Sequence, residues 1–551
     1  MKKRNLAMLM GLLMVVSSLA GCGSTTGKEA STEKATSSAA AESKGTSAAQ
    51  AESETEEEGI PLDYFAGVEL EIAVVRTTAD ASNSYAEKPI VIQAEEATGI
   101  HINWIEVDAG VASERLSTLL ASGDLPDALL GFCPAVTGNE SLFYDLSEEG
   151  LLETYAPDVL ADYELGGQGI MDMITQTDGG IYSLVTGPGS SYTSSPGAIM
   201  YIRNDWLDAL GMDIPSTADE FYEVLCAFRD NDMDGDGDAT NEIPMTFADS
   251  YWAGAFINLA NSYGIASTGQ SIDGSGFTLK DGQILSTYDT DEYRAFLEFY
   301  NKLAKEGLLD VEGFSQSTEQ YNTKKNEGRV GVMLGYTPPT DENIEYVAMA
   351  PFQGLEGVEV RKSGCLNMFY ANTTGLVASA KCSNIEALLW WWNYLHTETD
   401  IKYQARYGLE NYYWFKDDEG YHVGSAEGYE KDPNIDERTY GLGDPQSCPY
   451  IRPDESFIPD DTTPRVQAVQ AVEEYMLDID EILISRPVDA EKKEERNFIA
   501  TDLFELVKEY MANSVINGVT DASWDAYLKN LETYGYYEWL EWYQGYVDYE
   551  F

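Results

Sequence analysis

The sequence predicts an α/β fold of two lobes with a ligand cleft between them and a helical C-terminus. Strand-like and helix-like segments alternate between residues 68 and 132, which predicts a right-handed α/β unit with a mainly parallel sheet. A similar alternation restarts near residue 198, and roughly the last sixty residues have helical spacing. Two such units, with the chain crossing between them, favour a ligand site at the carboxyl ends of the strands.

The first lobe is expected to comprise mainly residues 65–190, with a returning segment near 330–380. Its opening stretch, VELEIAVV, alternates apolar and polar residues as a strand does. The predicted elements are strands at 68–75, 101–107, 127–132 and 179–185, with helices around 88–99 and at 112–123.

The second lobe is expected to comprise mainly residues 195–325 and 385–551. A helix is predicted to begin near Ser216 and Thr217, because Glu220 stands in the capping-box position. The other predicted elements are strands at 198–203 and 242–247, helices at 290–306 and around 387–395, and the C-terminal helices. A further strand is predicted at 328–334, at the start of the segment that returns to the first lobe.

Residues 1–21 have the features of a secretory signal peptide. MKKRN is basic, the apolar stretch after it is too short for a mature transmembrane helix, and Leu19-Ala20-Gly21-Cys22 matches the bacterial lipobox. We therefore expect Cys22 to be lipidated and to anchor the mature protein on the outer face of the membrane without spanning it. The alternative is an ordinary secretory signal with an incidental cysteine.

Residues 22–60 are expected to form the lipidated cysteine and a disordered tether, which leaves 61–551 as the folded body. Between Gly23 and Gly59 no residue is more apolar than alanine, so this segment cannot bury enough surface to fold. The formal net charge of the chain is −61, from 95 acidic and 34 basic residues. Nucleic acid and anionic lipid surfaces require basic residues, so neither is expected as a partner.

Cysteine and histidine patterns argue against a disulfide framework and against a histidine-rich metal site. Five cysteines remain after Cys22, far apart and odd in number. Cys365 and Cys382 could pair, although buried free thiols are favoured. The histidines His101, His396 and His422 are isolated from one another.

An acidic loop, DNDMDGDGDATNEIP (230–244), places aspartates on alternate positions. An EF-hand-like calcium loop uses oxygen ligands at positions 1, 3, 5 and 7, a glycine at 6 and a glutamate at 12. Counting from Asp232 puts Gly237 at position 6 but Glu242 at 11, whereas counting from Asp230 puts Asn241 at 12. A hard divalent cation, best Ca²⁺, would relieve the repulsion among the carboxylates. The alternative is a solvated acidic turn.

Five stretches carry a family resemblance: the lipobox LAGC, residues 201–228, the acidic loop running into NEIP, YGLENYYWF (407–415), and the tail 513–551. Together they resemble the extracellular solute-binding protein family 1, the lipid-anchored receptors of carbohydrate ABC importers in Gram-positive bacteria. The subgroup that is most similar includes the LplA-like lipoproteins and the alginate-oligosaccharide binders.

The resemblance implies a type II periplasmic-binding-protein fold, in which two lobes close over a sugar and present it to the permease subunits of an ABC transporter. It implies a receptor for an oligosaccharide, with no catalytic residues. We expect a monomer. In this family the acidic loop runs directly into a strand, which favours the register from Asp232. The ligands of a structural Ca²⁺ would then be Asp232, Asp234, Asp236, Asp238, Asn241 and Glu242.

Oligosaccharide sites combine aromatic platforms with polar side chains that fix the hydroxyl groups. Trp252 follows a predicted strand at a plausible cleft rim, and Trp414 lies in a connection between helices. Any of these aromatic side chains could pack in the core instead, and Arg203 could form a structural pair with Asp205 rather than a ligand-facing one. The candidate ligand-binding residues are Trp252, Trp414, Tyr251, Tyr182, Tyr192, Tyr412, Arg203 and Glu410.

Two other functions are compatible with parts of the pattern. A receptor for a peptide or another organic solute would have fewer stacking aromatic residues and a charge to anchor the termini. A secreted glycoside hydrolase needs two carboxylates about 5–10 Å apart across a cleft. With 95 acidic residues, such a pair cannot be recognised by spacing, and no hydrolase motif is present.

Overall fold

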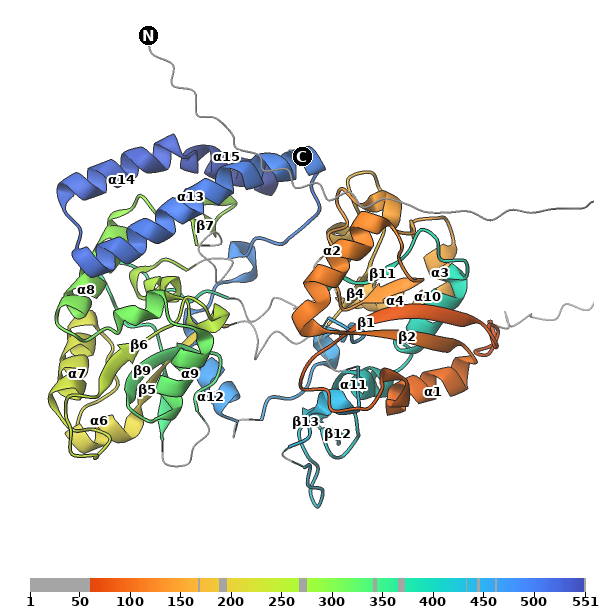
Figure 1. Ribbon diagram of the computed structural model, residues 1–551, viewed down its shortest axis with the longest axis horizontal. Helices are drawn as coiled ribbons and strands as arrows, with labels where there is room; N and C mark the ends of the chain where they lie inside the picture. The colour runs from red at the N-terminus through yellow and green to blue at the C-terminus, as the bar shows by residue number, and fades with distance from the viewer. Residues whose placement is uncertain are drawn as a thin grey trace, which may run out of the picture. The chain divides into compact units, whose positions relative to one another are not determined.

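Two mixed β-sheets, each with its own hydrophobic core, organise the computed structural model of the protein (Figure 1). The structure describes residues 60–166, 169–187, 196–266, 275–339, 344–364, 372–432, 434–442, 446–460 and 463–549. Within these ranges no helix has the length and apolar character needed to cross a membrane. The predicted mixed α/β class with a helical C-terminus is confirmed.

The first sheet has five strands in the order β2-β1-β3-β11-β4. The three strands predicted first, β1, β2 and β3, are parallel, as the right-handed strand–helix–strand order requires. β11 returns antiparallel to both β3 and β4. The bounds are β1 Glu69–Arg76, β2 His101–Asp108, β3 Ala128–Leu130, β4 Leu184–Thr186 and β11 Asn372–Ala378.

One helix of the first lobe, α10 (Ile385–Tyr394), is buried along its whole length. Its sequence, IEALLWWWNY, is apolar on nearly every side, and such a helix is stable only inside a core. Trp391 and Trp392 are therefore core residues, and the indole of Trp390 donates a hydrogen bond to the carbonyl of Leu62. The other elements are α1 Pro89–Thr98, α2 Ala112–Ser122, α3 Leu151–Tyr155, α4 Pro157–Gly166, α5 Ile170–Ile174, α11 Thr399–Tyr407, and the hairpin β12 Trp414–Lys416 and β13 Tyr421–Val423.

The second sheet has four strands in the order β10-β5-β9-β6. The helix before β6 begins where its capping box predicts, because Thr217 and Glu220 cap each other's backbone amides. The bounds are β5 Ile199–Arg203, β6 Ile243–Thr246, β9 Val330–Gly335 and β10 Tyr346–Met349, with α6 Asn204–Leu210, α7 Ala218–Asp230, α8 Asp291–Lys305, α9 Thr318–Asn326, and the hairpin β7 Phe277–Lys280 and β8 Gln283–Ser286.

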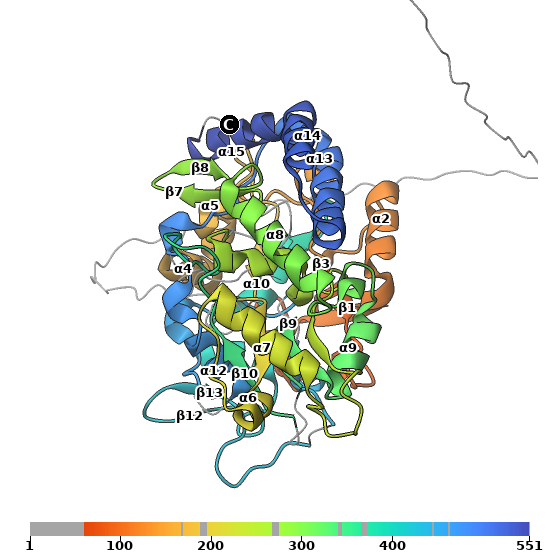
Figure 2. The ribbon, with the colours of Figure 1, turned by 90° about the vertical axis from the view of Figure 1, so that its left-hand side faces the viewer.

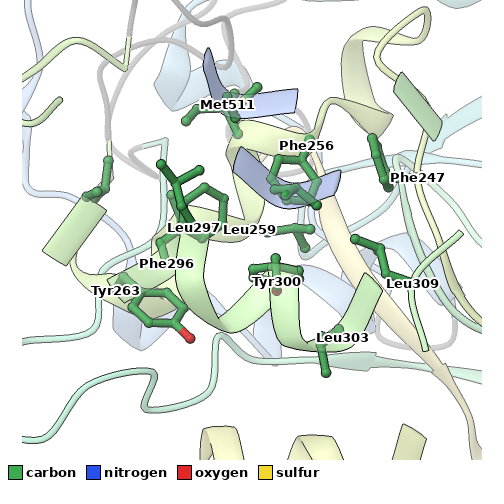
Figure 3. Packing of buried hydrophobic residues seen from close by; sticks show 14 of the residues in the cluster. Phe247, Phe256, Leu259, Tyr263, Phe296, Leu297, Tyr300, Leu303, Leu309 and Met511 are labelled. Atoms are coloured by element: carbon green, nitrogen blue, oxygen red, sulfur yellow. The ribbon is translucent and has the colours of Figure 1, made fainter. Parts of the chain in front are cut away.

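Aromatic side chains fill the core of the second lobe. Phe256 lies 5.2 Å from the rings of both Phe296 and Tyr300 of α8, and Phe247 packs against Phe256 at 4.8 Å (Figure 3). The C-terminal helices close this core, with Met511 of α13 among its members (Figures 2 and 3). They are α13 Ala490–Asn517, α14 Asp521–Thr533 and α15 Tyr536–Val547, and α12 spans Pro464–Gln470.

Three elements in the second half of the chain belong to a different lobe from the one predicted for them. β9 and β10, expected with the first lobe, join the second sheet, and only β11 returns to the first. α10 belongs to the first core rather than to the second lobe. The reason is that strand pairing and helix docking are long-range choices, which local periodicity does not encode.

Candidate ligand site and metal loop

One edge of the second sheet has the geometry of a ligand site. The carboxyl ends of the parallel strands β6 and β9 meet there, because Thr246 pairs with Met333. Open α/β sheets bind ligands outside this edge. Tyr251 and the 3-10 turn Trp252–Gly254 follow β6, so the sequence correctly placed both aromatic residues beyond this strand.

Tyr251 is half-buried, and its ring lies 6.2 Å from that of Tyr321. Burial raises the pKa of Tyr251, so its hydroxyl stays neutral and can donate a hydrogen bond. Nothing is described of the side chain of Trp252, and Tyr192 lies outside the described residues. Their roles stay predictions.

Arg465 of α12 reaches the same edge, and sequence reasoning missed it. Its guanidinium carbon lies 3.9 Å from the ring centroid of Tyr336, and its Nη1 donates to the carbonyls of Tyr336 (2.7 Å) and Gly197 (3.2 Å). The available signal was Pro464, which marks the first turn of a helix directly before a cation.

A pocket of about 300 Å³ lies at the corresponding edge of the first sheet. Residues 134–137, which follow β3, line one side of it together with polar residues near β4 and β11. Thr137 donates to Gln176 (3.0 Å), and Ser183 donates to the carbonyl of Thr373 (2.7 Å). Residues 485–488 and two cations of α13, Lys493 and Arg496, form the other side. None of these residues was singled out from the sequence.

Trp414, a candidate ligand-binding residue, is buried, and its contact with a ligand stays a prediction. Only 2% of Trp414 is exposed, and its indole nitrogen donates to the carbonyl of Gly408 at 2.9 Å. It packs against Tyr403 and Tyr421 at the base of a pocket of about 730 Å³ that Glu410 also lines. Tyr412 is exposed and forms an edge-on pair with Tyr429 at 5.3 Å.

Arg203 forms the pair with Asp205 that was one of its two predicted roles, and a ligand contact stays a prediction. The side chain is buried and makes two hydrogen bonds to Asp205, of 2.7 and 2.6 Å. It also donates to the carbonyl of Gly328, and its guanidinium lies over the ring of Trp206 at 4.5 Å. These bonds use three of its five N–H groups.

Tyr182 is half-buried and donates from its hydroxyl to Asp178 at 2.8 Å. Burial, then this hydrogen bond and the negative charge of Asp178, raise the pKa of Tyr182 to about 12. It packs beside the core of the first sheet, and a ligand contact remains a prediction.

The acidic loop gathers three of the predicted metal ligands. Carboxylate oxygens of Asp232, Asp234 and Asp236 lie within 4.8 Å of one another. Gly235 and Gly237 have φ values of +78° and +92°, which only glycine adopts without strain, and they let the loop turn tightly around Asp232. Both oxygens of Asp232 accept backbone hydrogen bonds, from Gly235 and Gly237 at 2.9 Å each.

Two further polar atoms fit a cation at this loop. The side-chain oxygens Oδ1 of Asn241 and Oε2 of Glu242 are buried and form no hydrogen bond. A buried unsatisfied oxygen is costly, and a bound cation would satisfy it. Oδ1 of Asp238 instead accepts hydrogen bonds from Thr240, which agrees with a backbone carbonyl as the ligand at this position. The donor set therefore fits Ca²⁺ in the register from Asp232.

Two α/β sheets with aromatic and polar side chains at their carboxyl edges define a ligand-binding protein of the two-lobed type. Comparison of the sequence with known families gives the particular family. The chain belongs to the bacterial extracellular solute-binding proteins, whose sequence profile matches residues 78–400, more than half of its length. This family consists of binding proteins rather than enzymes.

The sequence identity to individual relatives is low. The chain is 25% identical over 508 residues to the fructooligosaccharide ABC transporter substrate-binding protein FusA of Streptococcus pneumoniae, covering 84% of this chain and 87% of FusA. It is 22% identical over 456 residues to the polygalacturonan/rhamnogalacturonan-binding protein YtcQ of Bacillus subtilis, covering 80% and 83%.

Solved structures share the fold. An HMO-binding solute-binding protein of Bifidobacterium longum infantis has a TM-score of 0.73 at 24% identity, covering 87% of this chain and 98% of that protein. FusA itself, solved as an EF-hand mutant with fructo-nystose, has a TM-score of 0.72 at 22% identity, covering 88% and 99%.

Proposed function

We propose that the protein captures an oligosaccharide outside the cell and delivers it to the permease of an ABC importer. The observation that carries the proposal is similarity over most of the chain: FusA, a substrate-binding protein for fructooligosaccharides, aligns with 84% of this chain. The aromatic edge of the second sheet, with Tyr251 and the 3-10 turn at Trp252, would supply the stacking surface that sugars require.

The N-terminal segment completes this role. We propose that residues 1–21 are removed, that Cys22 carries lipid, and that the segment to residue 60 tethers a monomeric body to the outer face of a Gram-positive membrane. A flexible tether keeps the body close to its permease, which raises the effective concentration of the pair.

The acidic loop is proposed to hold a structural Ca²⁺. The ligands would be Asp232, Asp234, Asp236, the carbonyl of Asp238, Asn241 and Glu242. FusA was solved as an EF-hand mutant, which supports this proposal. In this chain the ion would join the end of α7 to the start of β6 and would take no part in sugar contacts.

Removing the metal tests this role. A site filled at 100 times its dissociation constant stabilises the fold by about 2.7 kcal/mol, so a chelator should lower the melting temperature by several degrees. Asp234→Asn should abolish the calcium dependence, whereas Asp230→Asn, with the same charge change beside Arg229, should keep it. A melting temperature indifferent to calcium in the unmodified protein would identify a solvated acidic turn.

A solute panel tests the main proposal. Isothermal titration against neutral and acidic oligosaccharides and against short peptides should show binding to oligosaccharides alone. Binding only to peptides would support the alternative receptor, and steady hydrolysis of a labelled oligosaccharide would support an enzyme.

A further inference from the structure

The pocket at the edge of the first sheet has the opposite charge to the rest of the molecule. The chain has 95 acidic and 34 basic residues, yet the described lining of this pocket contains three cations and no carboxylate. The cations are Arg486, Lys493 and Arg496. A pocket lined at random from this composition would be acidic, so the reversal points to a negatively charged ligand.

Two of the cations share one face of α13. Lys493 and Arg496 are three residues apart and so lie side by side on the helix. Among the described residues neither forms a salt bridge, although α13 carries glutamates at 491, 494 and 495. The adjacent Lys492 does pair with Glu495, at 3.0 Å. The charges of the pocket face are therefore not neutralised by the helix that carries them.

Aromatic residues of α15 hold the two arginines in place. The guanidinium of Arg496 lies 5.3 Å from the ring of Trp542, and that of Arg486 lies 4.4 Å from the ring of Tyr546. Arg486 also donates to the carbonyl of Tyr546. Positioned donors lose little entropy when a ligand binds, which strengthens recognition.

The rest of the described lining is uncharged and combines polar residues with apolar ones such as Val136 and Met173. Thr137, Gln176, Ser183 and Thr373 supply hydroxyl and amide groups, which suit the hydroxyls of a sugar. The volume, about 300 Å³, suits a small solute or a residue of a longer ligand.

We propose that this pocket binds the carboxylate of a uronic-acid residue, so that the cargo is an acidic oligosaccharide. The inference rests on the proposed function and narrows its substrate class. Arginine binds a planar carboxylate with two parallel hydrogen bonds, and lysine adds a point charge. Because the net charge of −61 repels an acidic ligand at long range, local cations are what such a ligand requires.

Matched pairs of ligands test the proposal. Oligouronates of two to six residues from polygalacturonan, alginate and glucuronan are compared with the same oligosaccharides after reduction of each carboxyl to a primary alcohol. Titration calorimetry should show that the unmodified protein binds at least one oligouronate about 10- to 100-fold more tightly than its reduced partner, as expected for charged hydrogen bonds.

Variants that each remove one positive charge test whether the preference for the carboxylate arises in this pocket. Lys493→Gln and Arg496→Gln should each remove most of the preference for the carboxylate, while binding of the reduced partner changes little. Lys492→Gln removes the same charge one position away, from a side chain that does not line the pocket, and should retain the preference. Circular dichroism melts confirm that all three variants are folded.

The outcomes separate this inference from the function on which it rests. Equal or tighter binding of neutral oligosaccharides, unaffected by either pocket variant, overturns the acidic cargo and leaves the sugar receptor standing. A preference lost equally in Lys492→Gln overturns the pocket, because the effect is then one of overall charge. Absence of binding to every oligosaccharide, with binding to peptides, overturns the sugar receptor itself.

Discussion

Lys362 offers a direct test of how this fold accommodates a buried cation. The side chain is 3% exposed, and its ammonium donates to the carbonyls of Pro196 (2.6 Å) and Ser363 (3.0 Å). Burial, followed by the positive charge of Arg465, lowers the pKa of Lys362 from 10.5 to about 7. Folding therefore works against the charged form of this residue.

The sign of the pH dependence follows from this shift. Below pH 7 the ammonium is charged in the folded and unfolded states, so the cost of burying it is constant. Between pH 7 and 10.5 the unfolded state binds more protons, so stability rises by up to about 1.4 kcal/mol per pH unit. Relative to a Lys362→Met variant, the unmodified protein should gain about 2 kcal/mol between pH 7 and pH 9.

Urea unfolding at pH 7, 8 and 9 and fixed ionic strength measures this difference. Lys529→Met, which removes an exposed lysine of α14, should track the unmodified protein at every pH. Tyrosine ionisation in the unfolded state is common to all three proteins and cancels. A difference between Lys362→Met and the unmodified protein that does not change with pH would refute the reasoning. It would mean that the two carbonyls keep the buried ammonium charged.

Three further substitutions test the packing and the buried charges. Asp162→Asn should destabilise the protein by about 1–3 kcal/mol in urea at pH 7, because it removes the carboxylate that buried His396 (2.6 Å) and Lys402 (2.7 Å) share, while Lys402 keeps Glu455 at 2.8 Å. Burial opposes ionisation of Asp162, but the hydrogen bond and charge of His396 and the charge of Lys402 lower its pKa. Its contribution is therefore present above about pH 4 and lost on acidification, and a variant with unchanged acid sensitivity would contradict this. Gly375→Ala places a methyl group 1.8 Å from the hydroxyl of Thr186, so it should lower the free energy of unfolding by about 1–3 kcal/mol or more in the same assay. Gly357→Ala is the control: its methyl group meets open space, so any loss of stability comes from backbone strain alone. Phe256→Ala should cost about 3–5 kcal/mol, and a smaller loss would mean that the core collapses around the cavity.

Local chemistry made several elements predictable. The capping box of Thr217 and Glu220 and the alternation of β1 are encoded within a few neighbouring residues, and both elements form where predicted. The acidic loop is equally local, since its spacing alone brings Asp232, Asp234 and Asp236 together. Features of this kind need no knowledge of the distant chain.

Burial and strand partners were not predictable in this way. The position of Trp414 in a connection between helices left both a ligand contact and core packing open, and Tyr403 and Tyr421 bury it from other segments. β9 pairs with β5 and β6, strands that lie far from it in the sequence. In both cases the deciding contacts are between residues that no window of the sequence contains together.

Cations, rather than the far more numerous acids, indicate where this protein recognises a charged ligand. Lys88, Lys324 and Lys402 each lie within 3.0 Å of a carboxylate and so stabilise the fold. Lys493 and Arg496 have no such role within the described structure, although carboxylates outnumber cations almost three to one. In so acidic a chain, two adjacent cations left without carboxylate partners at a pocket are better explained by an acidic ligand than by chance. In such acidic sequences, the few basic residues are therefore the better indicators of a charged-ligand site. Only the folded structure shows which of them have no carboxylate partner.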